Sequence, residues 1–105
     1  MVNDTKLEAV LQNLARGLKA HYKARFGELV LLEPKQEGLL ELLLILEGEV
    51  NQVREILRVE PNARLASVDS GLEIAVFPVS LETFNAALEP ELWEARFTGR
   101  VIEAD

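Results

Sequence analysis

Hydrophobic residues recur at three- and four-residue steps over the first quarter of the chain. Because such spacing places them on one face, we predict a helix over residues 6–26. Thr5 and Glu8 fit a capping box at its start, and Gly27 is placed to end it in the left-handed conformation. The apolar positions of this helix are Leu7, Val10, Leu11, Leu14, Leu18, Tyr22 and Phe26.

Two short apolar runs follow and predict strands over residues 29–33 and 39–46. The turn between them is short, which favours antiparallel pairing. The second run is apolar on both faces, as expected for a central strand. Leucine also favours helix, but a run of eight residues between Gly38 and Gly48 favours a strand.

A second helix is expected to begin near Asn51, which is a suitable cap. Pro61 has no backbone N–H to donate, so we expect the helix to break there. A further turn of helix would then carry Leu65 and Val68.

The last third of the chain predicts one strand, two helices and a short edge strand. The strand covers residues 72–78, after a turn at residues 69–71. Ser80 can cap a helix over residues 81–88, and Pro90 can open another that ends at Thr98-Gly99. Val101 and Ile102 add the edge strand.

The resulting order is α-β-β-α-β-α, with a short C-terminal strand as an addition. It predicts an α+β fold of two layers, a small mixed sheet with helices on one face. The chain has 105 residues, of which 49% are hydrophobic. That is enough for one core, so we expect a single domain over residues 1–105.

Charge and composition exclude several classes of partner. The net charge of −7 repels phosphate backbones, so we expect no nucleic-acid partner. Arg16, Lys19 and Lys23 form a basic stripe that we interpret as the solvated face of the first helix. No apolar run reaches the ~18–20 residues that span a bilayer, so no membrane partner is expected. The absence of cysteine and of a secretory signal pattern favours a cytoplasmic location.

Familiar catalytic motifs are missing. There is no glycine-rich phosphate loop and no Gly-x-Ser-x-Gly elbow. His21 is the only histidine, and one imidazole cannot form a metal cluster. We interpret it as an ordinary helix residue.

Two carboxylates stand inside predicted strands, Glu41 and Glu73. Because strand side chains alternate, each shares a face with apolar neighbours. If both sets face the same side, the two carboxylates could hold one hard divalent cation. The alternative is that both reach solvent at the margin of the sheet.

Several strings, together with the order of elements, resemble the minimal nucleotidyltransferase-like domains of bacteria and archaea. ELLLILEG (41–48) looks like the end of the family's aspartate-bearing strand, and NQVREILR (51–58) looks like its next helix. GLEIAVFPVSLETF (71–84) resembles the third strand with its following helix, and GRVIEAD (99–105) the C-terminal strand. The resemblance covers most of the chain and implies a nucleotidyltransferase-like fold.

The motifs that carry the family's chemistry are absent. LLEPKQEG (31–38) stands where the Gly-Ser phosphate loop is expected. Leu39, Glu41 and Ala75 take the places of three carboxylates that hold two magnesium ions in the family. One glutamate cannot hold both ions, so the resemblance implies loss of nucleotide transfer. We therefore expect no catalytic residue, no metal site and no cofactor.

The face that would bind nucleotide becomes mostly apolar, and such a surface has to be covered. We expect the cover to be either the C-terminal segment or a second chain, and we favour a homodimer. The family is often paired with a helical toxin-like protein, which is another candidate partner. The residues of this predicted partner-binding face, or of the segment over it, are Leu39, Leu43, Ile45, Ala75, Phe77, Trp93 and Phe97.

The leading hypothesis is thus a catalytically degenerate nucleotidyltransferase-like domain that binds protein, possible roles including that of an antitoxin. One alternative is a nucleotide- and Mg²⁺-binding enzyme with altered carboxylate geometry around Glu41 and Glu73. A second alternative is an unrelated small α/β interaction domain.

Overall fold

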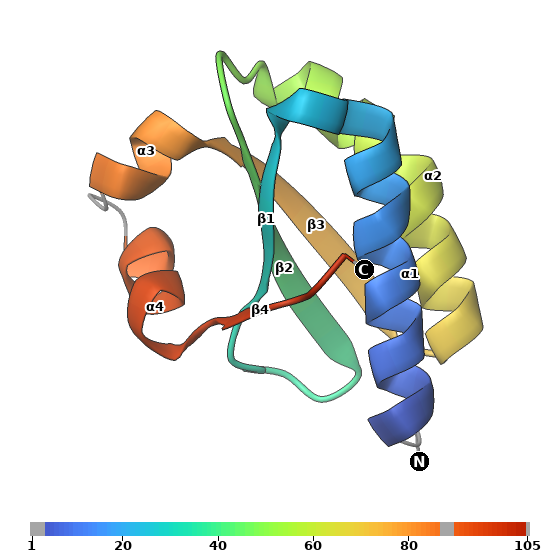
Figure 1. Cartoon of the computed structure of the whole chain (residues 1–105). Helices are drawn as coiled ribbons and strands as arrows, with labels where there is room; N and C mark the ends of the chain where they lie inside the picture. The colour runs from blue at the N-terminus through green and yellow to red at the C-terminus, as the bar shows by residue number, and fades with distance from the viewer. Residues whose placement is uncertain (1–3, 87–89, 105) are drawn as a thin grey trace.

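The computed structural model describes residues 4–86 and 90–104, and Figure 1 shows its layers. The elements in chain order are α1 (Asp4–Tyr22), a 3-10 helix (Lys23–Arg25), β1 (Phe26–Leu31), β2 (Leu39–Leu46), α2 (Gln52–Ser70), β3 (Glu73–Ser80), α3 (Leu81–Ala86), α4 (Pro90–Thr98) and β4 (Arg100–Val101).

The strands form one mixed sheet in the order β3-β2-β1-β4. β1 pairs antiparallel with β2 and with β4, while β2 and β3 run parallel. The β1–β2 hairpin and the mixed sheet are therefore confirmed, and so is the α+β two-layer class. β2 has the bounds that the sequence predicted, and five of its eight residues are buried in succession at its end.

The main core lies between the sheet and the two long helices, α1 and α2, which cover one face of it (Figure 1). Burial of this apolar surface is the principal stabilising contribution to such a fold. Its fully buried large side chains are Leu11, Leu18, Leu29, Leu42, Leu44 and Leu46. The short helices α3 and α4 lie by the opposite face, where a smaller apolar cluster forms.

The first helix ends earlier than predicted. α1 stops at Tyr22, and Lys23 has a φ of 55°, in the left-handed region. Gly27 lies in β1 instead, where an added Cβ would be 2.7 Å from the carbonyl oxygen of Ile45. Glycine is therefore needed at this position for close approach of two strands and not for ending a helix.

The predicted break at Pro61 is wrong, because α2 runs without interruption to Ser70. A proline inside a helix costs about 3 kcal/mol, since it removes one hydrogen bond and crowds the preceding turn. Pro61 is exposed, so the unpaired carbonyl of Leu57 lies on the solvent side of the helix. Val59 and Ala63, before and after the proline, are both buried in the main core, and this packing keeps the helix continuous.

The predicted caps at Asn51 and Ser80 are confirmed, whereas Thr5 lies inside α1, which begins at Asp4. The side chain of Asn51 accepts a hydrogen bond from the Arg54 N–H at 3.0 Å, and the Ser80 hydroxyl accepts one from the Thr83 N–H at 3.1 Å. Gly71 ends α2 at a φ of 75°. Among the described residues, no helix combines the length and apolar character needed to cross a membrane.

Candidate functional site

The candidate site is the sheet face opposite α1 and α2. Side chains alternate along each strand, and the parallel register of β2 and β3 brings Glu41 opposite Ala75 and Leu43 opposite Phe77. Leu39 precedes Glu41 by two residues on the same face. The positions 39, 41 and 75 are thus neighbours, and they carry one carboxylate between them.

The C-terminal helix covers part of this face within the chain itself. Leu92 and Ala95 of α4 pack against the cluster that contains Leu43 and Ile45, and Leu43 is only 5% exposed. Trp93 is 58% exposed, so the covering residues are its neighbours and not the predicted tryptophan. The side chain of Phe97 lies outside the described residues.

An ion pair also ties α4 to the sheet. Lys35, in the turn between β1 and β2, places its Nζ 2.8 Å from Glu94 Oε2 of α4. Both groups are partly solvated, so the pair contributes at most about 1 kcal/mol. The main consequence of the ion pair is that it keeps the β1–β2 turn beside the end of the apolar cluster that contains Leu43 and Ile45.

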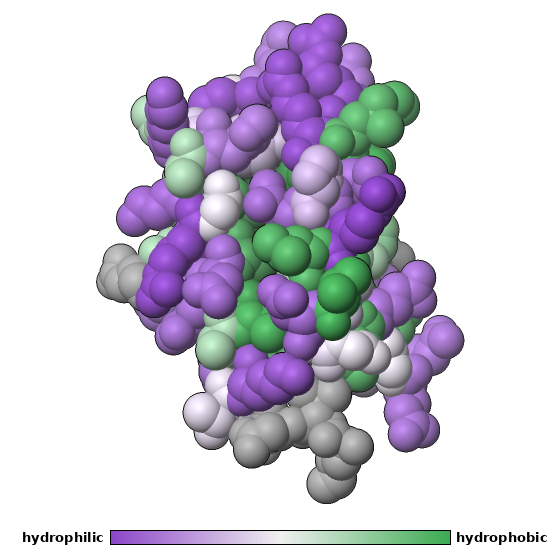
Figure 2. Space-filling model, turned by 90° about the vertical axis from the view of Figure 1, so that its right-hand side faces the viewer, coloured by the Kyte–Doolittle hydropathy of each residue, from purple (hydrophilic) through white to green (hydrophobic). Residues whose placement is uncertain are grey.

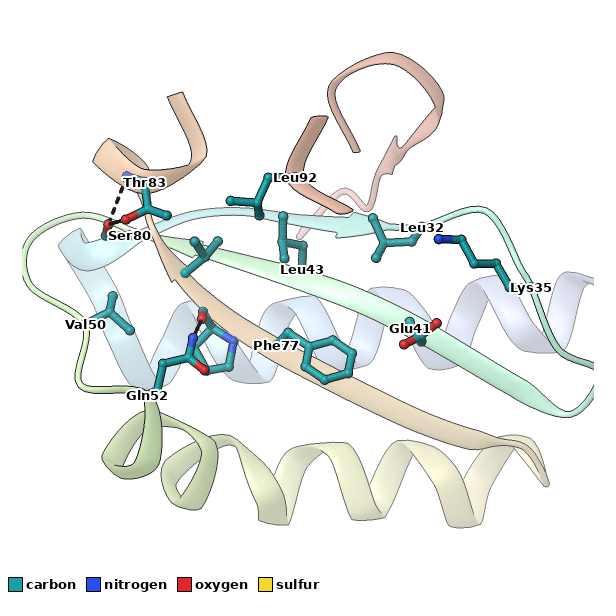
Figure 3. A pocket seen from close by; sticks show the side chains of 12 residues that line it. Leu32, Lys35, Glu41, Leu43, Val50, Gln52, Phe77, Ser80, Thr83 and Leu92 are labelled. Carbon is teal, nitrogen blue, oxygen red and sulfur yellow. Dashed lines mark hydrogen bonds between the residues drawn. The ribbon is translucent and has the colours of Figure 1, made fainter. Parts of the chain in front are cut away.

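A groove of about 760 Å³ remains beside α3 and α4 (Figure 3). Leu92 and Leu43 point toward each other there, whereas Phe77 and Glu41 lie further along the strands. Phe77 is 41% exposed, an unusual state for an aromatic side chain on a sheet face. The lining residues are Leu32, Lys35, Glu41, Leu43, Val50, Gln52, Phe77, Pro78, Val79, Ser80, Thr83 and Leu92.

The groove has an apolar floor and polar groups around it. Gln52 donates its Nε2–H to the carbonyl oxygen of Pro78 at 2.5 Å, and the Ser80 hydroxyl bonds that of Thr83 at 2.9 Å (Figure 3). Sequence reasoning named Ser80 only as a helix cap, and it missed Gln52, Thr83 and Lys35 as groove residues. The signal that could have found them is their position, since Gln52 begins α2, Ser80 ends β3 and Lys35 lies in the turn between β1 and β2.

Glu41 is partly exposed, and its carboxylate makes no hydrogen bond or ion pair with the described residues. Its carboxylate needs no buried partner, because it lies on the part of the face that α4 leaves open. This explains how a carboxylate is tolerated inside the most apolar run of the chain.

The two strand carboxylates lie on the same face of the sheet but are offset along it. Glu73 is opposite Leu39 and is two residues out of register with Glu41, a separation of roughly 8 Å between backbones. Among the described residues, no three acidic or histidine side chains gather into a possible metal site. His21 is an exposed residue of α1. Its imidazole ring meets the ring of Tyr22 edge-on, with 4.9 Å between the two ring centroids.

A second polar cluster lies where α1 meets the first turns of α2. Glu55 is 3% exposed and accepts a hydrogen bond from the Tyr22 hydroxyl at 2.8 Å. Arg58 Nη1 lies 3.5 Å from Glu55 Oε1, and Arg25 Nη1 lies 3.7 Å from Glu55 Oε2. Burial, followed by the hydrogen bond to Glu55, raises the pKa of Tyr22 from 10.0 to about 12.

This cluster is structural. Arg25 also donates to the carbonyl oxygens of Glu47 and Glu49, at 3.1 and 2.7 Å, and so links the segment after β2 to the 3-10 helix. Sequence reasoning missed Glu55. The signal was its spacing, because it lies four residues before Val59 and eight before Ala63 on the buried side of α2.

Comparisons with protein-family models, with curated proteins and with solved structures gave no match for this chain.

Proposed function

We propose that this chain is a catalytically degenerate nucleotidyltransferase-like module that acts in the cytoplasm by binding protein. One observation carries the proposal. The neighbouring positions 39, 41 and 75 carry leucine, glutamate and alanine. In the family that the sequence resembles, the corresponding positions carry three carboxylates.

The donor set argues against catalysis of nucleotide transfer. In-line displacement with two metal ions needs carboxylates that bridge both ions and hold them about 4 Å apart. Leu39 and Ala75 offer no oxygen ligand, and a single Glu41 cannot replace three groups. The residues present therefore do not fit the magnesium pair that the resemblance would imply.

The same face has features that suit a protein partner. Phe77 provides an exposed aromatic anchor beside an apolar floor formed by Leu43 and Leu92. Lys35 and Thr83 supply polar groups at the rim. An apolar centre within a polar rim is the usual anatomy of a specific interface, and aromatic anchors are common among its strongest contacts.

A photoreactive amino acid at position 77 tests the proposal. In cells that produce the protein natively, this variant is expected to give discrete covalent adducts with another polypeptide, identified by mass spectrometry. The matched control places the same group at Val101, which is comparably exposed but lies on β4, away from the groove. Adducts at neither position, or equally at both, would contradict a binding role for the groove.

A titration with Mg²⁺ and nucleoside triphosphates tests the enzymatic alternative on the same face. Trp93 is the only tryptophan, and its helix borders the groove, so its fluorescence reports on occupancy. We expect no saturable signal by fluorescence or calorimetry. Metal-dependent nucleotide binding that Glu41→Gln abolishes would replace the proposal with a nucleotide-binding function.

A further inference from the structure

The outward face of α2 is apolar, although it packs against no described part of the chain. At 100° per residue, the buried residues of α2 lie on one side and a row of hydrophobic residues lies on the other. These side chains expose between 61% and 75% of their surface. We call this row the α2 stripe; it consists of Val53, Leu57, Leu65 and Val68.

The stripe is continuous along the helix. Val53, Leu57, Pro61 and Leu65 follow at steps of four, and Val68 comes three residues later. Figure 2, which shows the molecule from the side of α1 and α2, has hydrophobic side chains gathered among hydrophilic ones on this face. Monomeric proteins rarely expose more than roughly 300–600 Å² of contiguous apolar surface, and larger patches mark interaction sites.

Strand addition beside the stripe is disfavoured. β3 is an edge strand, but α2 side chains already occupy its polar groups. The Ser67 hydroxyl accepts the Ile74 N–H at 3.0 Å, and Gln52 donates to the Pro78 carbonyl. Pro78 itself has no N–H to offer, so little of this edge can pair with a further strand. A helix is therefore a better candidate than a strand for the partner that covers the stripe.

We propose that the partner is a second copy of this chain, with the two α2 helices packed antiparallel. The charges on the stripe favour this occupant. Glu60 and Arg64 form an ion pair near its middle, with 50% and 71% of their side-chain surface exposed. Rotating one copy by 180° about the middle of the stripe brings Glu60 of each copy within one helical turn of Arg64 of the other.

The apolar residues meet in the same arrangement. A crossing centred at Pro61 sets Leu57 opposite Leu65 of the second copy, and it brings Val53 within one position of Val68. Antiparallel helices further align their dipoles favourably. Two-fold pairing of one patch with itself is the commonest oligomer interface. Because the stripe lies on the other layer from the groove, this pairing does not depend on the function proposed above.

Sedimentation velocity over a wide concentration range tests the pairing. The wild-type chain is expected to pass from monomer to dimer as its concentration rises. Leu57→Glu and Val68→Glu should each raise the dissociation constant at least about tenfold. Both side chains are exposed, so the circular dichroism spectrum of the monomer should not change. A wild-type chain that stays monomeric throughout would overturn the proposal.

Charge-reversal variants distinguish specific pairing through α2 from non-specific association. Glu60→Arg makes the middle of the stripe wholly positive and Arg64→Glu makes it wholly negative, so neither variant should pair with itself. An equimolar mixture of the two should form a heterodimer, because every contact across the axis then joins opposite charges. Failure of the mixture to associate would overturn pairing through this part of α2.

Phe77→Glu separates this inference from the proposed function. The change lies in the groove and should leave the monomer–dimer equilibrium of the wild type unaltered. A dimer that Phe77→Glu abolishes and Leu57→Glu preserves would show that the copies meet through the groove. That outcome would overturn pairing through α2 and would still support a binding role for the sheet face.

Discussion

Replacing Leu43 with glutamate is expected to lower the free energy of unfolding by at least about 3 kcal/mol, whatever the protein concentration. Leu43 is buried by its own chain, in the cluster that includes Leu92 and Ala95 of α4. The substitution removes an apolar side chain from this cluster and sets a carboxylate among groups that cannot pair with it. Domains of this size are stable by only about 5–15 kcal/mol, so much of the population would unfold.

Urea denaturation at several protein concentrations measures this effect. The matched control is Phe77→Glu, on the same face but 41% exposed, which should cost no more than about 1 kcal/mol. A Leu43→Glu effect that grows with dilution or disappears at low concentration would mean that this residue is buried between chains. Concentration independence supports cover by α4.

Removing the carboxylate of Glu55 is expected to have the second large effect. Glu55→Ala should lower the free energy of unfolding by about 3 kcal/mol, because it leaves the buried Tyr22 hydroxyl without its acceptor and frees two arginines. Arg25 and Arg58 remain partly solvated, which limits the loss. Glu49→Ala is the control, since it removes an exposed carboxylate from the same end of the sheet. Equal effects of the two substitutions would contradict a structural role for the buried cluster.

The pH dependence of stability provides a separate readout of this cluster. The pKa of Tyr22 is about 12 in the folded chain, against 10.0 ordinarily. Between these values the unfolded chain releases its proton first, so stability should be full below pH 10 and fall as the pH rises to 12. The loss is roughly 2–3 kcal/mol.

Tyr22 is the only tyrosine, so the absorbance of tyrosinate follows its ionisation directly. In Glu55→Ala the pKa should move back toward 10.0, although burial would still hold it above that value. Tyr22→Phe should abolish this part of the alkaline loss and cost about 1 kcal/mol at neutral pH. Ionisation of native Tyr22 at its ordinary pKa would contradict the buried contact with Glu55.

Local patterns predicted much of the fold. The bounds of β2 follow from an apolar run between two glycines, and Asn51 and Ser80 cap the helices that they were expected to cap. These features depend on neighbours in the chain, so the residues that determine them are adjacent in sequence. The hairpin of β1 and β2 is of the same kind, because its turn is short.

The errors arose where distant segments meet. Pro61 should end a helix on local grounds, but burial of Val59 and Ala63 against the sheet outweighs the lost hydrogen bond. Gly27 resembles a helix terminator in sequence, and its actual role depends on the carbonyl of Ile45, eighteen positions away. Tertiary packing overrides local preference in both cases.

The sequence by itself determined which side chains share a face of each strand, because alternation along an extended chain is a local property. It also determined that Leu39 and Ala75 cannot act as metal ligands. Only the tertiary structure decided that these positions adjoin Glu41, that Leu92 and not Trp93 covers Leu43, and that α2 has an unpaired apolar face. Strand register and helix docking depend on contacts between segments far apart in the chain, and no local pattern contains them.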